Sequence, residues 1–234
     1  MSLVVRLLQH NDSKDWDVYV SNHADGTFCH RAGWRKVAEK GAGQRAVYLL
    51  AERDDVLVGV LPLVYRQSIL FGRALISSMF AVYGGPLADD PDAYDALDDA
   101  AWKLAIDLKV PSLEYRSVKA RNTENALWSS DAGVAATFQK ALSSDAEQIL
   151  LDIPRKQRAV VRKSLKAGLS CSWEKDIDAF YALYAESVRN LGTPVFPKPL
   201  FQQFVSEFGQ DVEVQIIYAP DGTAVASLMS FYHK

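Results

Sequence analysis

The residues best suited to binding an anion lie between positions 154 and 168. Residues 155 to 166 contain six cationic side chains and no acidic one, although the whole chain carries a net charge of −3. Cations three and four residues apart share one face of a helix, where they repel one another unless an anion lies nearby. Phosphate groups suit the planar fork of arginine. The segment therefore predicts a basic helix that binds phosphate through Arg158, Arg162 and Lys163, against the alternative of a solvated helix whose cations pair with acidic residues elsewhere.

A second candidate site lies at residues 189–197. Arg189 falls in the last turn of a predicted helix, where the helix dipole alone would favour a cation. One glycine and two prolines restrict the link to the next helix. Such a link would hold Arg189 and Thr193 toward a groove, and it would equally serve as a plain structural corner.

A third candidate is the sequence Tyr83-Gly84-Gly85-Pro86, which follows an apolar predicted strand. Glycines at this point would let a ligand approach the backbone, although a tight turn is the commoner explanation. Arg116 ends another predicted strand. It would either face the same groove as Tyr83 or pair with an acidic residue.

Several functional classes lack their sequence signatures. The chain has no G-x-S-x-G, Walker A or G-x-G-x-x-G motif, its four histidines lack the H-E-x-x-H spacing, and its two cysteines lie far apart. We therefore predict no metal site and no resident cofactor. The net charge of −3 argues against a DNA-binding protein. The longest uncharged stretch in the first half is shorter than the roughly 20 residues of a spanning helix, so no transmembrane segment is expected. Two lone cysteines favour a reduced, cytoplasmic setting.

The elements that would position these residues alternate between helices and strands, which predicts a mixed α/β fold. An apolar stripe at helical spacing after Asp90-Pro91 predicts a helix that Pro111 ends. The other predicted helices cover residues 13–23, 31–40, 154–167, 177–191 and 197–208. The predicted strands cover residues 3–8, 46–52, 56–65, 74–80, 112–116, 135–142, 212–219 and 223–233.

The chain contains a weak internal repeat. A gap-free shift of 167 positions brings together similar residues in the same predicted order of helix, helix, strand, turn and strand. Among the pairs are Trp34 with Phe201, Asp54 with Asp221, Val58 with Val225, and Tyr65 with Tyr232. The repeat predicts a duplicated domain, although any α/β chain can reuse a hairpin. The first copy continues to Arg116 and the second stops soon after Tyr232, so we expect the second copy to be incomplete.

These segments together resemble a known family. Residues 138–168, with an acidic stretch, Leu151-Asp152 and a basic Arg-Lys-x-x-x-Gly helix, resemble the start of the second domain in the FemAB (FemABX) family. Residues 30–34, 59–63, 83–86 and 189–196 resemble a subgroup found with exosortase (PEP-CTERM) and exopolysaccharide loci. The resemblance covers nearly all of the chain. It implies tandem acetyltransferase-like (GNAT-like) domains, which we place at residues 1–133 and, incomplete, at residues 134–234.

The resemblance also implies an activity. FemAB relatives move an aminoacyl group from aminoacyl-tRNA onto an amine of a peptidoglycan precursor. The implied function here is acyl or aminoacyl transfer to an amine of a cell-envelope or exopolysaccharide precursor, with aminoacyl-tRNA or acyl-CoA as co-substrate. The implied partners are a phosphate-bearing or lipid-linked substrate and charged tRNA, at the inner face of the membrane. No catalytic base carries over from the family, and we expect little activity from an incomplete second domain.

Two other functions remain open at this point. An acetyl-CoA-dependent GNAT N-acetyltransferase would need a Q/R-x-x-G-x-G/A loop between a strand and a helix. The only near match is Gly41-Ala42-Gly43, which has Ala38 in place of glutamine or arginine and follows a predicted helix. A non-enzymatic module that binds RNA or lipid phosphate would use the basic helix alone. No aromatic residues interleave its cations, which disfavours single-stranded nucleic acid.

Overall fold

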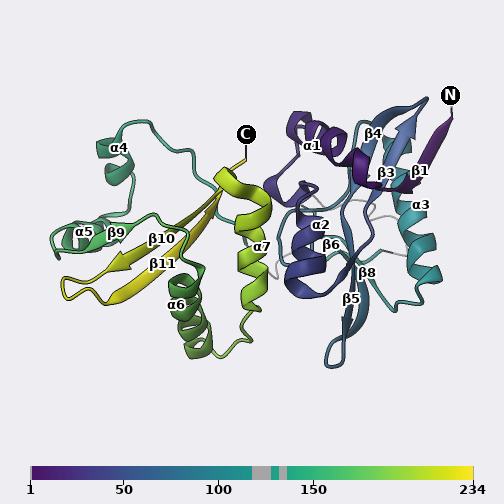
Figure 1. The fold of residues 1–234 in the computed structure, drawn as a ribbon. Helices are drawn as coiled ribbons and strands as arrows, with labels where there is room; N and C mark the ends of the chain where they lie inside the picture. The colour runs from purple at the N-terminus through teal and green to yellow at the C-terminus, as the bar shows by residue number, and fades with distance from the viewer. Residues whose placement is uncertain (1, 118–127, 132–135, 234) are drawn as a thin grey trace. The chain divides into compact units, whose positions relative to one another are not determined.

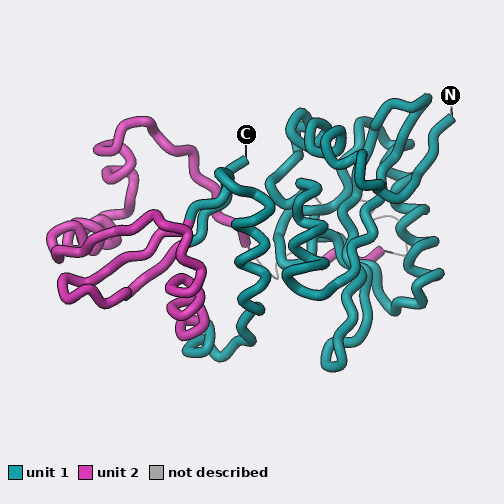
Figure 2. The backbone as a smooth tube through the Cα atoms, viewed as in Figure 1, with its two compact units in different colours: residues 1–119, 188–213, 229–234 teal, residues 120–187, 214–228 magenta. Residues whose placement is uncertain are grey.

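The computed structural model describes residues 2–117, 128–131 and 136–233, which fall into two compact units (Figures 1 and 2). Unit 1 consists of Met1–Lys119, Val188–Glu213 and Met229–Lys234, and unit 2 of Ala120–Ser187 and Val214–Leu228. The domain boundary predicted between residues 133 and 134 lies outside the described residues and stays a prediction.

Unit 1 contains two four-stranded sheets. The first has the order β1 (Leu3–Leu7), β3 (Leu49–Arg53), β4 (Val56–Leu61) and β7 (Leu87–Ala88), with antiparallel neighbours. The second has the order β2 (Arg45–Ala46), β5 (Leu63–Ser68), β6 (Gly72–Ser77) and β8 (Leu113–Glu114), in which β6 and β8 are parallel. The single strand predicted over 56–65 is wrong, because the chain leaves the first sheet at Pro62 and enters the second. Proline lacks the N–H that a continuous ladder would use.

Helix α3 (Pro91–Asp107) packs against residues of both sheets. Its inward face includes Leu97, Ala101 and Ala105, which contact a cluster containing Leu61 of β4 and Leu75 of β6. Small alanine side chains let the helix approach the sheets closely. The predicted start is confirmed, since the Asp90 carboxylate accepts a hydrogen bond of 3.0 Å from the Ala93 N–H.

A second layer of unit 1 combines early and late parts of the sequence. It contains α1 (Ser13–Asn22), α2 (Trp34–Lys36), the π-helical turn η3 (Val37–Gly41) and α7 (Lys198–Phe208). Trp34 packs edge-on against Phe204 of α7, with ring centroids 4.8 Å apart. A Cβ at Gly41 would lie 2.9 Å from Leu200 Cα, so glycine permits this close helix approach. The helix predicted over 31–40 is therefore shorter than expected and continues as a π turn.

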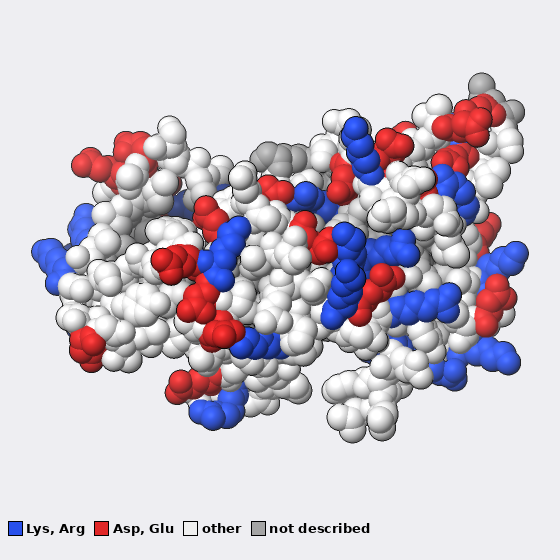
Figure 3. Space-filling view, in the orientation of Figure 1, with Lys and Arg blue, Asp and Glu red and all other residues white. Residues whose placement is uncertain are grey.

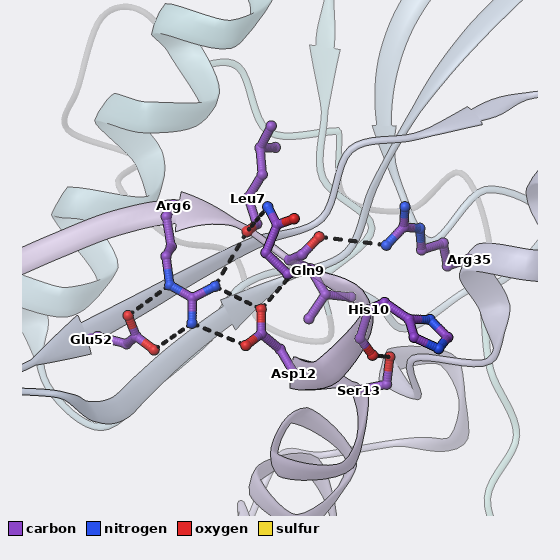
Figure 4. Close-up of polar contacts among 9 residues, drawn as sticks. Arg6, Leu7, Gln9, His10, Asp12, Ser13, Arg35 and Glu52 are labelled. Atoms are coloured by element: carbon purple, nitrogen blue, oxygen red, sulfur yellow. Dashed lines mark hydrogen bonds and ion pairs between the residues drawn. The ribbon is translucent and has the colours of Figure 1, made fainter.

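Arg6 joins three elements at one edge of unit 1 (Figure 4). Its guanidinium donates to both carboxylate oxygens of Glu52 on β3, at 2.7 and 2.8 Å, and to both oxygens of Asp12, at 2.6 and 3.1 Å. Asp12 ends the 3₁₀ turn η1 (His10–Asp12) before α1, and its pKa is lowered chiefly by the hydrogen bond from Arg6. The double fork is the geometry in which arginine–carboxylate pairs are strongest.

Replacing Arg6 with methionine should lower the free energy of unfolding by about 1–2 kcal/mol, because four charge-assisted hydrogen bonds are lost at a half-exposed site. The measurement is urea denaturation at neutral pH. Arg35→Met is the matched control, since Arg35 makes one ion pair of 3.3 Å with Glu39 and should cost about 0.5 kcal/mol. An equal loss of unfolding free energy in Arg6→Met and Arg35→Met would show that the double fork contributes no more stability than a single ion pair.

A three-stranded sheet of order β11-β10-β9 holds the strands of unit 2. These strands are β9 (Ser170–Ser172), β10 (Val212–Tyr218) and β11 (Ala224–Phe231), and the helices are α4 (Ala146–Leu151), α5 (Arg155–Leu165) and α6 (Ile177–Asn190). Phe180 of α6 is buried, and its carbonyl accepts a hydrogen bond from Ser227 of β11. The strand predicted over 135–142 is wrong for the described residues 136–142, which are not in a strand.

The order of elements repeats along the chain as the internal repeat predicts. Apart from the short helical turns and β2, which belongs to the other sheet, the series β1, α1, α2, β3, β4 corresponds to β9, α6, α7, β10, β11. Strands β3 and β10 each lie between the two neighbours of their series. Leu49 of β3 lies opposite Leu7, whereas Ile216 of β10 lies opposite Ser172. A gap-free shift of 167 positions would place residue 174 opposite Ile216, so the observed pairing differs from that shift by two residues. Side chains alternate between the two faces of a strand, so a shift of two residues keeps each side chain on the same face.

Candidate functional site

Helix α5 displays the basic segment that the sequence singles out. It begins after Pro154, and its cations are exposed apart from Arg158, which is half-buried. Neither Arg162 nor Lys163 forms an ion pair with any described residue. The same holds within the described ranges for Arg155, Lys156 and Lys166. Figure 3 shows blue surface where Figure 1 places α5. The helix therefore presents cations whose charge is not neutralised by neighbouring side chains.

Arg158, unlike Arg162 and Lys163, is already hydrogen-bonded within the chain. Its guanidinium donates to the backbone carbonyl of Leu151 at 2.6 Å and to that of Ile153 at 3.0 and 3.1 Å. These carbonyls lie at the end of α4 and in the link to α5, where helix carbonyls lack intrahelical partners. Arg158 therefore fixes the start of α5 relative to α4, while Arg162 and Lys163 are free to contact a ligand.

Tyr83 and Arg116, predicted from separate segments, lie together in unit 1. The Gly84 N–H donates to the Arg116 carbonyl at 2.9 Å, and the Arg116 guanidinium donates to the Ala81 carbonyl at 3.1 Å and to Glu114 at 2.8 Å. Arg116 thus pairs with an acidic residue, one of the two roles the sequence allowed, and also holds the loop that carries Tyr83.

A turn without any site signature in its sequence closes on the same loop. The Thr27 hydroxyl donates to the Tyr83 carbonyl at 2.9 Å, and the Ser78 hydroxyl donates to the Cys29 carbonyl at 2.9 Å. Thr27 also begins the 3₁₀ turn η2 (Phe28–His30). These hydrogen bonds cross-link residues about fifty positions apart. We define residues 27–30, 77–85 and 114–117 as the loop cluster.

His30 is the buried centre of the loop cluster, with 2% of its surface exposed. Its Nε2 lies 3.0 Å from the Gly85 carbonyl, which can only accept, so Nε2 carries the proton. Nδ1 then accepts from the Thr27 N–H at 3.2 Å. Burial lowers the pKa of His30 to about 4, so the ring is neutral near pH 7. Nδ1 also lies 2.8 Å from the Thr27 hydroxyl oxygen, so both ring nitrogens are held by groups of the loop cluster, which makes His30 a positioning residue.

Cys29 brings a thiol to the loop cluster. The side chain is half-buried and not in a disulfide. Burial raises its pKa, opposed by hydrogen bonds from the backbone of Tyr83 and Val82. A thiol with a raised pKa is protonated at neutral pH and is a poor nucleophile.

Arg189 and Thr193 lie at the C-terminal end of α6, and both are exposed. The Thr193 N–H donates to the Val188 carbonyl at 3.3 Å, and Gly192 has a φ of +75°, as in a glycine-ended helix. Phe196, which follows in the same segment, packs edge-on against Phe80 with ring centroids 5.3 Å apart. Within unit 1 this contact connects the segment to the loop cluster.

Metal and membrane signatures are both missing from the part of the chain that the structure describes. No three His, Cys, Asp or Glu side chains there are grouped as metal ligands would be. Likewise, none of the described helices has the length and apolar character needed to cross a bilayer.

Comparison with known proteins gives a fold relationship. No protein-family model matches the sequence, and no curated protein matches it. The structure of FemX matches 94% of this chain with a TM-score of 0.64 and 18% sequence identity, and the chain spans 58% of FemX. A ribosomal-protein-alanine N-acetyltransferase from Brucella melitensis biovar Abortus 2308 matches 60% of this chain and 100% of its own, with a TM-score of 0.41 and 14% identity. We base the fold assignment on FemX alone. The match confirms the predicted fold class, a mixed α/β fold of the GNAT-like type that the FemAB resemblance implies.

Proposed function

We propose that this protein transfers an acyl or aminoacyl group to an amine of a cell-envelope or exopolysaccharide precursor on the cytoplasmic side of the membrane. The observation that carries the proposal is the FemX fold, which extends over 94% of the chain. The exposed cations of α5 add a surface for the phosphate groups of either a charged tRNA or a nucleotide-linked acceptor. The sequence resemblance to exosortase-associated proteins adds the exopolysaccharide precursor as a candidate acceptor.

The reaction needs little covalent chemistry from the protein. The acceptor amine attacks the ester carbonyl of the donor, a C–N bond forms, and the ester C–O bond breaks. The amine loses its proton, and the leaving oxygen of the donor takes one up. The work of the chain is then to orient the two substrates and to hold their phosphates. We assign phosphate contact to Arg162 and Lys163 and the positioning of α5 to Arg158.

Arg189, Thr193 and Tyr83 remain proposed acceptor contacts. Two of them are exposed at the end of α6, and Tyr83 is half-buried in the loop cluster. Arg116 is proposed with them, although its guanidinium already bonds Glu114 and the Ala81 carbonyl. We therefore expect Arg116 to act on the acceptor by fixing the loop around Tyr83.

Transfer is tested with the full product of the gene, alanyl-tRNA labelled in its amino acid, and a UDP-linked muropeptide or an amino-sugar polymer as acceptor. We expect label on the acceptor amine in an amide bond, released by strong acid but not by mild base. Acetyl transfer from acetyl-CoA in place of aminoacyl transfer would favour an N-acetyltransferase. Binding of tRNA without transfer from either donor would favour a non-enzymatic anion-binding module.

The assignment within α5 is tested by Arg162→Ala. Loss of one charge-assisted phosphate contact of roughly 1.5–3 kcal/mol should raise the Kd for fluorescein-labelled alanyl-tRNA about tenfold or more. The effect should shrink at high salt. Stability should hardly change, because Arg162 is exposed and has no ion pair with a described residue. Fluorescence anisotropy and urea denaturation measure the two quantities.

Arg158→Ala provides the matched comparison on the same helix. It should lower stability by about 1–3 kcal/mol, because the carbonyls of Leu151 and Ile153 lose a charged donor. Lys103→Ala, an exposed cation on α3, controls for net charge. An Arg162→Ala variant that binds normally but unfolds more easily would show that Arg162 is structural and would contradict the assignment.

A further inference from the structure

The turn between β5 and β6 exposes three consecutive large apolar side chains. Ile69 is 105% exposed, Leu70 is 87% exposed and Phe71 is 66% exposed. Figure 1 shows the turn projecting from the second sheet of unit 1, and Figure 3 shows the same projection as white surface. Single exposed apolar residues are common, but a contiguous group at a projecting turn is typical of an interaction site.

The turn is closed by its own hydrogen bonds. Ser68 pairs with Gly72 across the hairpin, and Gly72 has a φ of +67°, which glycine adopts without strain. The Phe71 N–H donates to the Ser68 hydroxyl at 3.2 Å, and the Arg66 guanidinium donates to the Phe71 carbonyl at 2.9 Å. The apolar side chains are therefore displayed by a closed hairpin.

Cations surround the apolar turn, and acidic residues are missing from its sequence. Residues 56–88 contain no aspartate or glutamate. Arg73 lies opposite Gln67 and Arg45 lies opposite Tyr65, so these two arginines share one face of the sheet, while Arg66 lies on the other. None of the three arginines forms an ion pair with a residue that the structure describes.

We propose that this turn inserts into the surface of a bilayer that contains anionic phospholipid. A convex apolar tip fits a bilayer without a preformed pocket, whereas a protein partner would have to supply one. Strands rise about 3.4 Å per residue, so Arg66 and Arg73 lie roughly 3–7 Å behind the Ser68–Gly72 pair that closes the turn, near the depth of the lipid phosphates when the tip is inserted. Arginines on both faces of the hairpin can each reach a phosphate. The inference stands on unit 1 alone and does not depend on the proposed transferase activity.

The test is flotation of the 234-residue chain with vesicles. We expect the protein to float with vesicles of phosphatidylcholine and phosphatidylglycerol in equal amounts and to stay in solution with phosphatidylcholine alone. Leu70→Ser with Phe71→Ser should weaken binding more than tenfold, since two large side chains no longer enter the bilayer. Arg73→Ala should weaken it about fivefold at low salt and less at high salt.

The matched control is Ile106→Ser, which removes a side chain that is 72% exposed on α3 of the same unit and should leave binding unchanged. All variants should keep the urea midpoint of the parent chain, because the altered side chains are exposed. Unchanged flotation of the double serine variant would overturn the proposal. Sedimentation provides a second way to contradict the proposal. If the parent chain is a dimer and the double serine variant is a monomer, a second copy of the chain covers the turn, and the proposal is overturned.

Discussion

Replacing Gly84 with alanine should lower the free energy of unfolding by about 2–3 kcal/mol or more, because the loop cluster leaves no room for a Cβ. A Cβ at this position would lie 1.6 Å from Ser78 Oγ and 2.0 Å from Ser78 Cβ. Ser78 cannot easily withdraw, since its hydroxyl donates to the Cys29 carbonyl at 2.9 Å. Urea denaturation measures the change in stability.

A second substitution makes the cause of this loss testable. Ser78→Gly removes both colliding atoms, and it also relaxes a residue whose φ is +44°. The double variant Gly84→Ala with Ser78→Gly should therefore be more stable than Gly84→Ala alone. It should stay below the parent, because the hydrogen bond from Ser78 to the Cys29 carbonyl, worth about 1 kcal/mol, is lost. Gly192→Ala, with a φ of +75° and open space around it, should cost about 1 kcal/mol. Additive losses in the double variant would contradict the proposed collision.

The stability of the protein should fall as the pH drops from about 6.5 to about 4, by roughly 3 kcal/mol, because of His30. Burial lowers the pKa of His30 from 6.5 to about 4 in the folded chain, so the unfolded chain binds this proton more readily. The stability is therefore fully present above pH 6.5 and decreases with acid until the folded pKa is reached. Urea midpoints measured at several pH values across this window test the effect.

His30→Gln should remove this part of the pH dependence, since glutamine has no titrating group. The substitution should also lower stability at neutral pH, because it replaces a buried ring whose two nitrogens are hydrogen-bonded. His10→Gln, which replaces an exposed histidine outside the loop cluster, is the matched control for the loss of an imidazole. A His30→Gln profile parallel to that of the parent between pH 4 and 6.5 would show that other groups titrate in this range and that the Gly85 carbonyl does not hold a neutral ring.

Local patterns predicted most helices of this fold because each one carries its own start or end signal. Asp90-Pro91 begins α3 as expected, and Asp176 caps α6 by accepting from the backbone N–H groups of residues 178 and 179 at 2.9 and 3.0 Å. Gly209, with a φ of +51°, ends α7. These signals act within one turn of helix, so a single sequence contains them in full.

The elements that were missed depend on partners distant in sequence. β9 has three residues and β7 has two, and each exists only because a neighbouring strand completes its hydrogen bonds. The exchange of sheets at Pro62 also requires both sheets to be in place. Short strands carry too few residues for a pattern to emerge.

The candidate site was predicted in part for the same reason. Composition alone located the cations of α5, and the structure shows Arg162 and Lys163 exposed. The hydrogen bond from the Arg158 side chain to the Leu151 carbonyl could not be predicted, because α4 itself was not predicted. Tyr83 and Arg116 were selected separately, but their contact depends on a loop closed by Thr27 and Ser78, whose partners lie about fifty residues away.

The packing of α7 against α2 has a consequence for synthesis of the chain. Phe204 and Phe208 cover Trp34 and Phe28, yet residues 120–197 separate α7 from the first part of unit 1. At a translation rate of about 5–20 residues per second, synthesis of these residues alone takes roughly 4–16 s, during which the aromatic surface stays uncovered. During that interval Trp34 and Phe28 are available to chaperones and to other nascent chains. The two sheets and α3 can already assemble in this time, so the aromatic layer of unit 1 closes only after α7 has been made.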